Sequence, residues 1–464
     1  MALGNKFRIY PTKEQENTLL RWIGCQRFVY NAKVGEDRYF RRFLKKSLSL
    51  CGQQSPVDQK YAQFISEDTS FLRDVPSQVL RNGAYRWRSA YQRFFSKAVS
   101  GRPKIKKKHG RQSVMLTSEL FSLVLEGERI LLDIGTQKCP VGRIAVNNHN
   151  IVEDVPAAIY IGVEAGHWYM SFALNADVPV MSDAERAEEL ISFGEQELLK
   201  ISEGLDLGVN IPLASSSGKT FGLSEVQHKR IKSEERHKKQ WQRKQARRKE
   251  GSKNQAKAKQ KVARYQRYGT NVRHDFAHKT SREMVNSSDV RLFIFEDLKI
   301  KDMSASAKGS TEKPGKKVKQ KSGLNRAILG SSWGKLKLFT SYKARQAEKL
   351  VIVVPAHQTS QECSVCGFIH KDNRLHQAEF VCLSCGHKEN ADINAAKVVK
   401  KRGVSALLHG EIKFKTPRKS GIRKQLGLGR PEVTPEGEVV SRAGRKAGAQ
   451  SSLIRETSTT AEAA

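Results

Sequence analysis

Two CxxC pairs near residue 370 constrain this chain more than any other feature. Cys363 and Cys366 form the first pair. Cys382 and Cys385 form the second, and fifteen residues separate the two pairs. Each CxxC turn directs two thiolates at one point, and two such turns close a tetrahedron, as in structural zinc sites. The spacing therefore predicts a zinc module with these four cysteines as the ligands of Zn²⁺.

The other cysteines, Cys25, Cys51 and Cys139, are isolated in the sequence. Four clustered and three isolated cysteines indicate a reducing interior with bound zinc rather than a disulfide framework. The chain has no apolar run of about 18 residues, so we expect no membrane span. Its first residues lack the apolar core of a secretory signal, which favours a cytoplasmic location.

The net charge is the second strong signal. The 464 residues include 83 Lys and Arg against 47 Asp and Glu, a formal charge of +36. Such an excess repels itself unless an anionic partner compensates it, and a phosphate backbone is the obvious partner. A merely solvated surface or an anionic membrane are the alternatives. Both are less favoured, because the positive charge is concentrated in segments and no lipidation signal is present.

Two segments carry much of this positive charge. Residues 101–108 are strongly basic, and residues 225–268 hold 17 Lys and Arg with only a few glutamates. The second segment has a helical pattern that we expect to continue as one helix to about residue 285. A block this charged cannot pack as a core. It is either a solvated helix or a nucleic-acid-binding one, and the single sign of its charge favours the second.

The remaining pattern divides the chain into parts. Residues 4–10 alternate as a strand, and Thr12 with Gln15 predicts a capping box that opens helical sequence up to about residue 97. Short β-like runs between about 113 and 175 suggest a small barrel. An acidic helical stretch follows at 183–200. Periodicity is lost after residue 399, and the tail from about 411 is predicted to be disordered.

Three acidic residues stand out by their context. Asp206 lies in an apolar strand, Glu296 ends another, and Asp392 opens a helix after the cysteines. A carboxylate in such surroundings is costly unless it is paired or binds metal. Three carboxylates brought together repel, and divalent cations relieve that repulsion. Two Mg²⁺ ions about 4 Å apart hydrolyse phosphodiesters, one activating the attacking water and the other stabilising the leaving oxygen.

The alternative is that these acids are helix caps or halves of ion pairs, as is common among 47 acidic residues. Asp297 competes with Glu296 for the same role. Strand alternation predicts that Asp297 points away from the face that Glu296 occupies.

At this point the motifs resemble a known family, the TnpB (OrfB) proteins of bacterial insertion sequences. The resemblance covers about residues 5–400. The DLGV segment at 206–209 and the FEDL segment at 295–298 resemble the first two motifs of a RuvC-like nuclease core. The cysteine pairs and the DINAA segment at 392–396 resemble the zinc module and the third motif. The sequence NIPL at 210–213 departs from the family pattern, which leaves Asp206 itself unaffected.

The resemblance implies an α/β fold plus a β-barrel: an RNase H-like (RuvC) nuclease core with an inserted zinc ribbon, preceded by an oligonucleotide-binding-like barrel that holds a helical recognition domain. We expect the barrel to comprise residues 1–11 and 101–182, the helical domain residues 12–100, and the linker residues 183–200. The nuclease core would comprise 201–360 and 387–405, the zinc ribbon 361–386, and a basic tail 406–464.

The resemblance also implies a function. The chain would be a Mg²⁺-dependent, RNA-guided DNA endonuclease, with Asp206, Glu296 and Asp392 as the catalytic, metal-binding acids. Its partners would be a guide RNA from the transposon end and double-stranded target DNA, in the bacterial cytoplasm at the nucleoid. Guide pairing would read the target sequence while the protein reads a short flanking motif.

Three other functions remain as alternatives. A guide-RNA-bound regulator would bind DNA without cleavage, although all three acids are present. A structural RNA-binding protein would use the acids only in ion pairs. A helix-turn-helix repressor fits residues 12–50 alone and leaves the rest unexplained. We expect no strand transfer, because no His-hydrophobe-His motif with a catalytic tyrosine is apparent.

Overall fold

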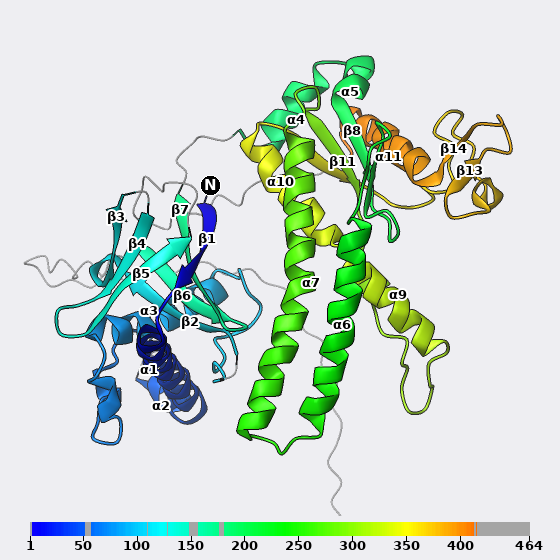
Figure 1. The fold of residues 1–464 in the computed structure, drawn as a ribbon. Coiled ribbons are helices and arrows are strands. Elements are labelled where there is room, and N and C mark those ends of the chain that lie inside the picture. Colours follow the sequence, from blue (N-terminus) through cyan, green and yellow to red (C-terminus); the bar gives the residue numbers. More distant parts are fainter. Residues whose placement is uncertain are drawn as a thin grey trace, which may run out of the picture. The chain divides into compact units, whose positions relative to one another are not determined.

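The computed structural model describes residues 2–51, 57–108, 110–127, 129–147, 156–175, 181–412 and 414 (Figure 1). The predicted disordered tail therefore lies almost wholly outside the described residues. In the described parts of the chain, no helix is long and apolar enough to cross a membrane.

The N-terminal strand organises an antiparallel sheet of seven strands in the order β2-β6-β7-β1-β5-β4-β3. β1 (Ala2–Tyr10) pairs with β5 and β7, so that a short N-terminal segment joins strands far along the chain. The expected strand at 4–10 and the expected strands after residue 112 are thus confirmed. The other six strands are β2 (Gln112–Thr117), β3 (Phe121–Glu126), β4 (Arg129–Gly135), β5 (Pro140–Asn147), β6 (Ala158–Glu164) and β7 (His167–Asn175).

The helices before this sheet begin as the sequence predicts. α1 (Lys13–Tyr39) opens with the Thr12–Gln15 capping box and continues through a π-turn into α2 (Lys45–Leu50). The helical pattern does not extend unbroken to residue 97, however. Residues 57–76 hold two 3₁₀ turns, where the Thr69 hydroxyl bonds the Phe64 carbonyl and competes with helix formation. α3 (Ser77–Phe95) then resumes the helix.

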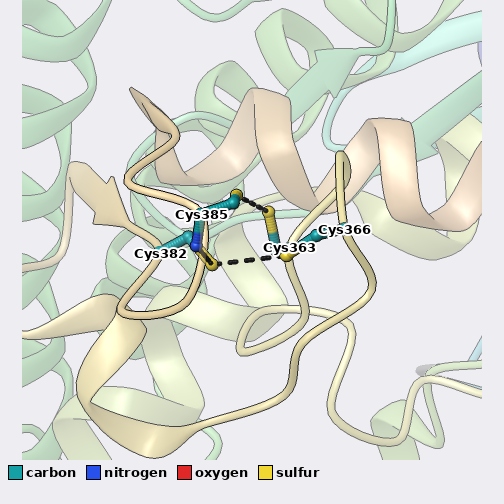
Figure 2. Close-up of side chains that lie close together, drawn as sticks. All are labelled: Cys363, Cys366, Cys382 and Cys385. Atoms are coloured by element: carbon teal, nitrogen blue, oxygen red, sulfur yellow. Dashed lines mark hydrogen bonds between the residues drawn. The ribbon is translucent and has the colours of Figure 1, made fainter.

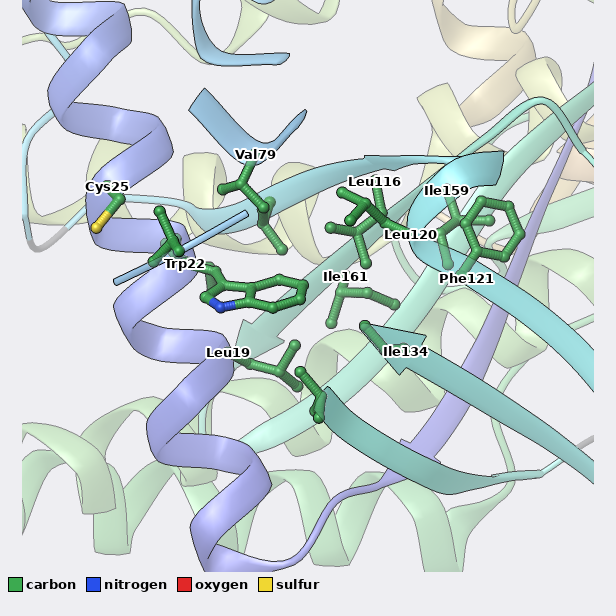
Figure 3. Packing of buried hydrophobic residues seen from close by; sticks show 14 of the residues in the cluster. Leu19, Trp22, Cys25, Val79, Leu116, Leu120, Phe121, Ile134, Ile159 and Ile161 are labelled. Carbon is green, nitrogen blue, oxygen red and sulfur yellow. The ribbon is translucent and has the colours of Figure 1, made fainter. Parts of the chain in front are cut away.

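α1 and α3 share one apolar core with the sheet (Figure 3). Leu19 and Trp22 of α1 and Val79 of α3 are buried together with Leu116 and Ile161 of the strands. Burying aromatic and aliphatic side chains of this size stabilises the packing by roughly 2 kcal/mol each. The helices are therefore fixed on the sheet by their own apolar faces.

A second, mixed sheet has the order β10-β9-β8-β11-β12. β8 (Ser202–Asp206), β11 (Leu292–Glu296) and β12 (Leu350–Val354) are parallel to one another. β9 (Leu213–Ser215) and β10 (Thr220–Phe221) extend the sheet antiparallel beyond β8. Since parallel strands end at one edge, the last residues of β8 and β11 lie side by side.

The helix α11 (Ala391–Leu408) packs directly on this sheet. A Cβ atom at Gly204 would lie 2.1 Å from the Ala396 carbonyl oxygen, and one at Gly403 would lie 2.4 Å from the Ile294 side chain. Two glycines, one on each element, therefore allow the close approach. α11 continues to Leu408, past the expected core boundary at residue 405, because Ala406 and Leu407 are buried.

The basic segment is a helical hairpin rather than the single helix that we predict. α6 (Glu225–Ala246) and α7 (Lys253–Val285) lie side by side and are joined by a turn at 247–252 (Figure 1). Gly251 takes a left-handed conformation with φ of 75°, and the Ser252 side chain caps α7. The Gly-Ser pair is the signal that the sequence offers for this break.

The acidic stretch at 183–200 is helical, as expected, and folds as α4 (Asp183–Ile191) and α5 (Glu195–Ile201). Leu190 and Leu198 are buried, so both helices pack against their neighbours. The remaining elements are α8 (Ile300–Met303), α9 (Val318–Gly330), α10 (Trp333–Gln346), and, within the cysteine segment, β13 (Glu379–Val381) and β14 (Lys388–Asn390).

Candidate active site and zinc centre

The four cysteines converge as the spacing predicts. Figure 2 shows their side chains pointing toward one another from two loops. The Sγ atoms of Cys363 and Cys385 are 3.7 Å apart, and those of Cys366 and Cys382 are 3.6 Å apart. A tetrahedron with Zn–S bonds of 2.3 Å requires sulfur atoms about 3.8 Å apart. The geometry and the thiol donors therefore fit Zn²⁺.

Asparagine side chains attach this cysteine module to α11. Asn394 is fully buried, accepts a hydrogen bond from the Ser364 amide at 2.9 Å and donates one to the Glu362 carbonyl at 2.8 Å. Asn373 similarly joins the two cysteine loops, since it donates to the Gln361 carbonyl and accepts from the Leu383 amide. The sequence reasoning gave neither residue a role, although Asn394 lies inside the DINAA segment.

Two of the predicted acids lie at the ends of adjacent parallel strands. Asp206 and Glu296 are the last residues of β8 and β11. Because Leu205 pairs with Phe295 in the residue before each acid, the two acids lie at the same level of the sheet. Glu296 is buried, and the Thr359 hydroxyl donates a hydrogen bond to its Oε1 atom. The fold thus holds Glu296 in one orientation at the edge of the sheet.

The third acid reaches this edge from the N-terminus of α11. The side chain of Asn390 caps the helix by accepting a hydrogen bond from the backbone amide of Asp392. The Asp392 carboxylate extends toward Gly208, just beyond β8. A Cβ atom at Gly208 would lie 3.8 Å from Asp392 Oδ2. Arg374, from the cysteine module, donates to Asp392 Oδ1 at 2.8 Å.

The two other carboxylates act electrostatically on Asp206. Burial, followed by the charges of Glu296 and Asp392, raises the pKa of Asp206 to about 8, although Arg374 acts in the opposite direction. Burial also raises the pKa of Glu296, against the effects of Thr359 and Arg402. These shifts mark a buried acidic site that a bound cation would stabilise.

Asp297, the competing candidate, lies outside this site. Its side chain is 57% exposed and pairs with Lys337 at 3.7 Å, whereas Glu296 is buried. The alternation of side chains along the strand therefore directs the two neighbouring acids apart, as predicted.

The carboxylates do not converge as tightly as the thiols. Within the described residues, only the four cysteines bring three or more ligand atoms all within 4.8 Å of one another. The acids offer the oxygen donors that Mg²⁺ prefers, with Glu296 buried and Asp206 and Asp392 partly buried, so the donor set fits this ion. Arg374 supplies positive charge at the same place, and the sequence analysis had not identified it.

Similarity to known proteins decides the family. Family models match residues 1–34 (a "Helix-turn-helix domain" of IS605 OrfB), 196–307 ("Probable transposase", IS605 OrfB) and 333–399 ("Cas12f1-like, TNB domain"). The chain is 30% identical over 410 residues to the "Putative RNA-guided DNA endonuclease InsQ" of Escherichia coli K12. The alignment covers 88% of this chain and 94% of the relative. The chain belongs to the IS605 OrfB/TnpB family.

Other relatives agree with this assignment. A "Putative RNA-guided DNA endonuclease" of Streptomyces pristinaespiralis is 28% identical, over 88% of this chain and 90% of its own length. A Cas12f1 endodeoxyribonuclease of Sulfoacidibacillus thermotolerans is 42% identical over 72 residues, 16% of this chain and 17% of the relative. The OrfB/TnpB chain is thus related to Cas12f1.

A solved structure supports the fold. The Cas12f1 chain in a cryo-EM complex with single guide RNA and target DNA matches with a TM-score of 0.50 and 12% identity, over 86% of this chain and 98% of its own. The OrfB/TnpB chain therefore has a Cas12f-like α/β fold with an antiparallel N-terminal sheet and a mixed RuvC-like sheet. Residues 2–34, despite the name of the model that matches this region, form a strand and part of one continuous helix.

Proposed function

We propose that this OrfB/TnpB protein is an RNA-guided DNA endonuclease that cleaves target DNA beside a short flanking motif. The observation that carries the proposal is the buried site at the strand ends, where Asp206 is close enough to Glu296 and Asp392 for their charges to raise its pKa. A buried acidic site of this kind costs stability unless it binds cations. The similarity to full-length relatives with this name supports the same function.

In the proposed site, Asp206, Glu296 and Asp392 hold Mg²⁺. When bound, two such ions supply an activated water and stabilise the leaving oxygen of a phosphodiester. The protein residues do the positioning. Thr359 orients the Glu296 carboxylate, and the helix cap at Asn390 fixes the direction in which Asp392 leaves α11. Arg374 offers its guanidinium to Asp392 and is placed to interact with phosphate.

The proposed partners are a guide RNA from the transposon end and double-stranded DNA, at the bacterial nucleoid. The formal charge of +36 supports a phosphate-rich partner. We assign the seven-stranded sheet (1–11 and 101–182) to an oligonucleotide-binding-like barrel and residues 12–100 to guide or target recognition. The RNase H-like core (201–360 and 387–405) with its zinc ribbon (361–386) would cut the DNA.

The proposal is tested by purifying the protein from its native locus context and sequencing the RNA that co-purifies. The reconstituted complex is then given a matched plasmid library with Mg²⁺, beside the Asp206→Ala variant. A discrete RNA and cleavage that the variant loses, with RNA binding kept, support the endonuclease. A discrete RNA with target binding but no cutting supports a regulator instead, and the absence of any discrete RNA contradicts the proposal.

A further inference from the structure

A small basic pocket lies between α1, α3 and the segment that leads into β2. Its volume is about 170 Å³. Five basic side chains line it, those of Arg27, Arg86, Lys106, Lys107 and Arg111, and the described lining includes no acidic residue. Like charges gathered in one concave site repel one another, so the pocket favours an anion.

Arg86 is held at the pocket by neutral groups. Its Nη1 atom donates to Gln26 Oε1 at 3.0 Å and to the Ser113 carbonyl at 3.1 Å. Gln26 is itself buried, and its Oε1 atom also accepts a hydrogen bond from the Met115 backbone amide at 2.8 Å. This second bond fixes the position of the atom to which Arg86 donates. Burial lowers the pKa of Arg86. The guanidinium is therefore ordered and partly desolvated, and neither acceptor neutralises its charge.

Lys106 is fixed in the same way from the other side. Asn31 donates to the Lys106 carbonyl at 2.9 Å and accepts the Lys106 amide at 2.8 Å. The ammonium lies 3.5 Å from the centre of the Tyr30 ring. Burial and the nearby Arg86 lower the pKa of Lys106 to about 7. The amine is therefore only partly protonated near neutral pH, and an anionic ligand would favour its charged form.

Among the described residues, the one acid on which a lining arginine is seen to act, Glu164, is already engaged. Burial alone would raise the pKa of Glu164. Lys6 and nearby arginines, among them Arg111, outweigh this effect, so the pKa of Glu164 is lowered. The Glu164 carboxylate pairs with Lys6 at 3.0 Å. Arg27, on the opposite wall, donates to the neutral Gln112 side chain at 2.8 Å. The pocket thus keeps an excess of positive charge.

We infer that this pocket is a binding site for one backbone phosphate of a nucleic acid, held by Arg86 and Lys106 and flanked by Lys107 and Arg111. The inference rests on the proposed function for the identity of the nucleic acid, which is either the guide RNA or the target DNA. A phosphate bound there anchors the strand relative to α1 and α3 without reading its bases.

The test uses the full-length protein with its co-purified guide RNA. Arg86→Gln removes the central guanidinium. It also removes the hydrogen bonds that connect α3 to α1 and β2, so this variant risks misfolding. The exposed pair Lys107→Gln/Arg111→Gln avoids that risk. The matched control, Arg129→Gln/Lys138→Gln, removes the same charge from exposed positions on β4 and the turn after it. Affinity for guide RNA, and affinity of the complex for target DNA, are measured between 50 and 300 mM salt.

The expected result is that the pocket variant loses about tenfold in affinity for one nucleic acid and that its salt slope falls by about 1, while the control changes neither. A loss confined to RNA assigns the phosphate to the guide, and a loss confined to DNA assigns it to the target. If the pocket and control variants have equal affinities and salt slopes in a complex that still cleaves DNA, the phosphate site is refuted. The proposed endonuclease function is then unaffected. Absence of guided cleavage by the unmodified protein contradicts the proposed function instead.

Discussion

The cysteine cluster and the carboxylate site are in contact through Arg374, yet they are built in different ways. The cysteine ligands come from 23 consecutive residues, 363–385, and their sulfur atoms already lie at zinc-binding distances. The acids come from β8, β11 and α11, across residues 206–392, and they do not gather within 4.8 Å.

This difference is the one expected between a structural site and the proposed reactive site. A closed tetrahedron of thiolates contributes its binding free energy to folding. The raised pKa of Asp206 means that its ionised form costs stability in the absence of a cation. Breaking the first site should therefore damage the fold, whereas breaking the second should abolish activity and leave the fold intact or more stable.

The largest expected effect comes from the carboxylate site. Glu296→Gln keeps the shape of a buried side chain but removes a charge from the proposed metal site, so guided cleavage should fall at least about 10³-fold. Single-turnover cleavage of a matched plasmid measures this, beside thermal melting. The exposed neighbour provides the control, because Asp297→Asn should cleave normally. Loss of cleavage together with loss of folding in Glu296→Gln would contradict the contrast between the sites.

The complementary change is in the cysteine cluster. Cys382→Ser should release zinc and lower the free energy of unfolding by about 3 kcal/mol, because three ligands no longer close the tetrahedron. Metal analysis and denaturant unfolding measure the two quantities. Cys51→Ser, at an exposed isolated cysteine, should change neither. Full zinc content in Cys382→Ser would refute the assignment of this ligand.

The same contrast explains what the sequence predicts well. CxxC spacing is local, so that the four ligands follow from a short stretch of sequence. The strand that ends in Glu296 is apolar enough to be recognised, whereas Asp206 is marked only by its neighbours Leu205 and Leu207. Parallel pairing of the two strands then places the acids side by side. Asp392 stands out as the acid that opens a helix just after the cysteines, and the family resemblance points to the same residue. For these residues, local pattern and tertiary position agree.

The supporting residues depend on tertiary contacts that no local pattern specifies. Arg374 and Thr359 act on acids that are 18 and 63 positions away in the chain. An arginine or a threonine in a loop has no distinctive spacing, so the sequence alone does not identify either one. The turn between α6 and α7 was missed for a different reason, since the charge pattern continues unbroken across Gly251 and Ser252.

A pH measurement sharpens the comparison. The ordinary pKa of Asp206 is 3.8, and its value in the folded protein is about 8. Between these values the folded state binds more protons than the unfolded one, so stability falls as pH rises from about 4 to 8. Asp206→Asn removes this loss, and without Mg²⁺ it should be more stable than the unmodified protein at pH 8.5 by roughly 2 kcal/mol, with a smaller difference at pH 5.5.

Thermal and denaturant unfolding at the two pH values measure this difference. Asp297→Asn is the control, because it makes the same substitution at the exposed neighbour of Glu296. Added Mg²⁺ should stabilise the unmodified protein and not Asp206→Asn. The prediction fails if the difference in stability between Asp206→Asn and the unmodified protein is the same at both pH values. Ionisation of Asp206 would then not destabilise the fold.

The smallest expected effect concerns the orientation of one acid. Thr359→Val keeps the volume of a buried side chain but removes the hydroxyl that donates to Glu296. Groups that orient metal-binding side chains typically contribute 10- to 100-fold in affinity or activity. We therefore expect the Mg²⁺ concentration for half-maximal cleavage to rise about tenfold, with little change in the rate at saturating Mg²⁺.

Thr340→Val is the matched control for this change. Thr340 is fully buried, and its hydroxyl has no hydrogen-bond partner among the described residues. The same loss of a hydroxyl there should leave the Mg²⁺ dependence unaltered. If both variants shift that dependence equally, the effect is one of general packing. If only Thr359→Val shifts it, the carboxylate site owes part of its metal affinity to a single neutral side chain, whereas the closed cysteine site gains its affinity from the ligands themselves.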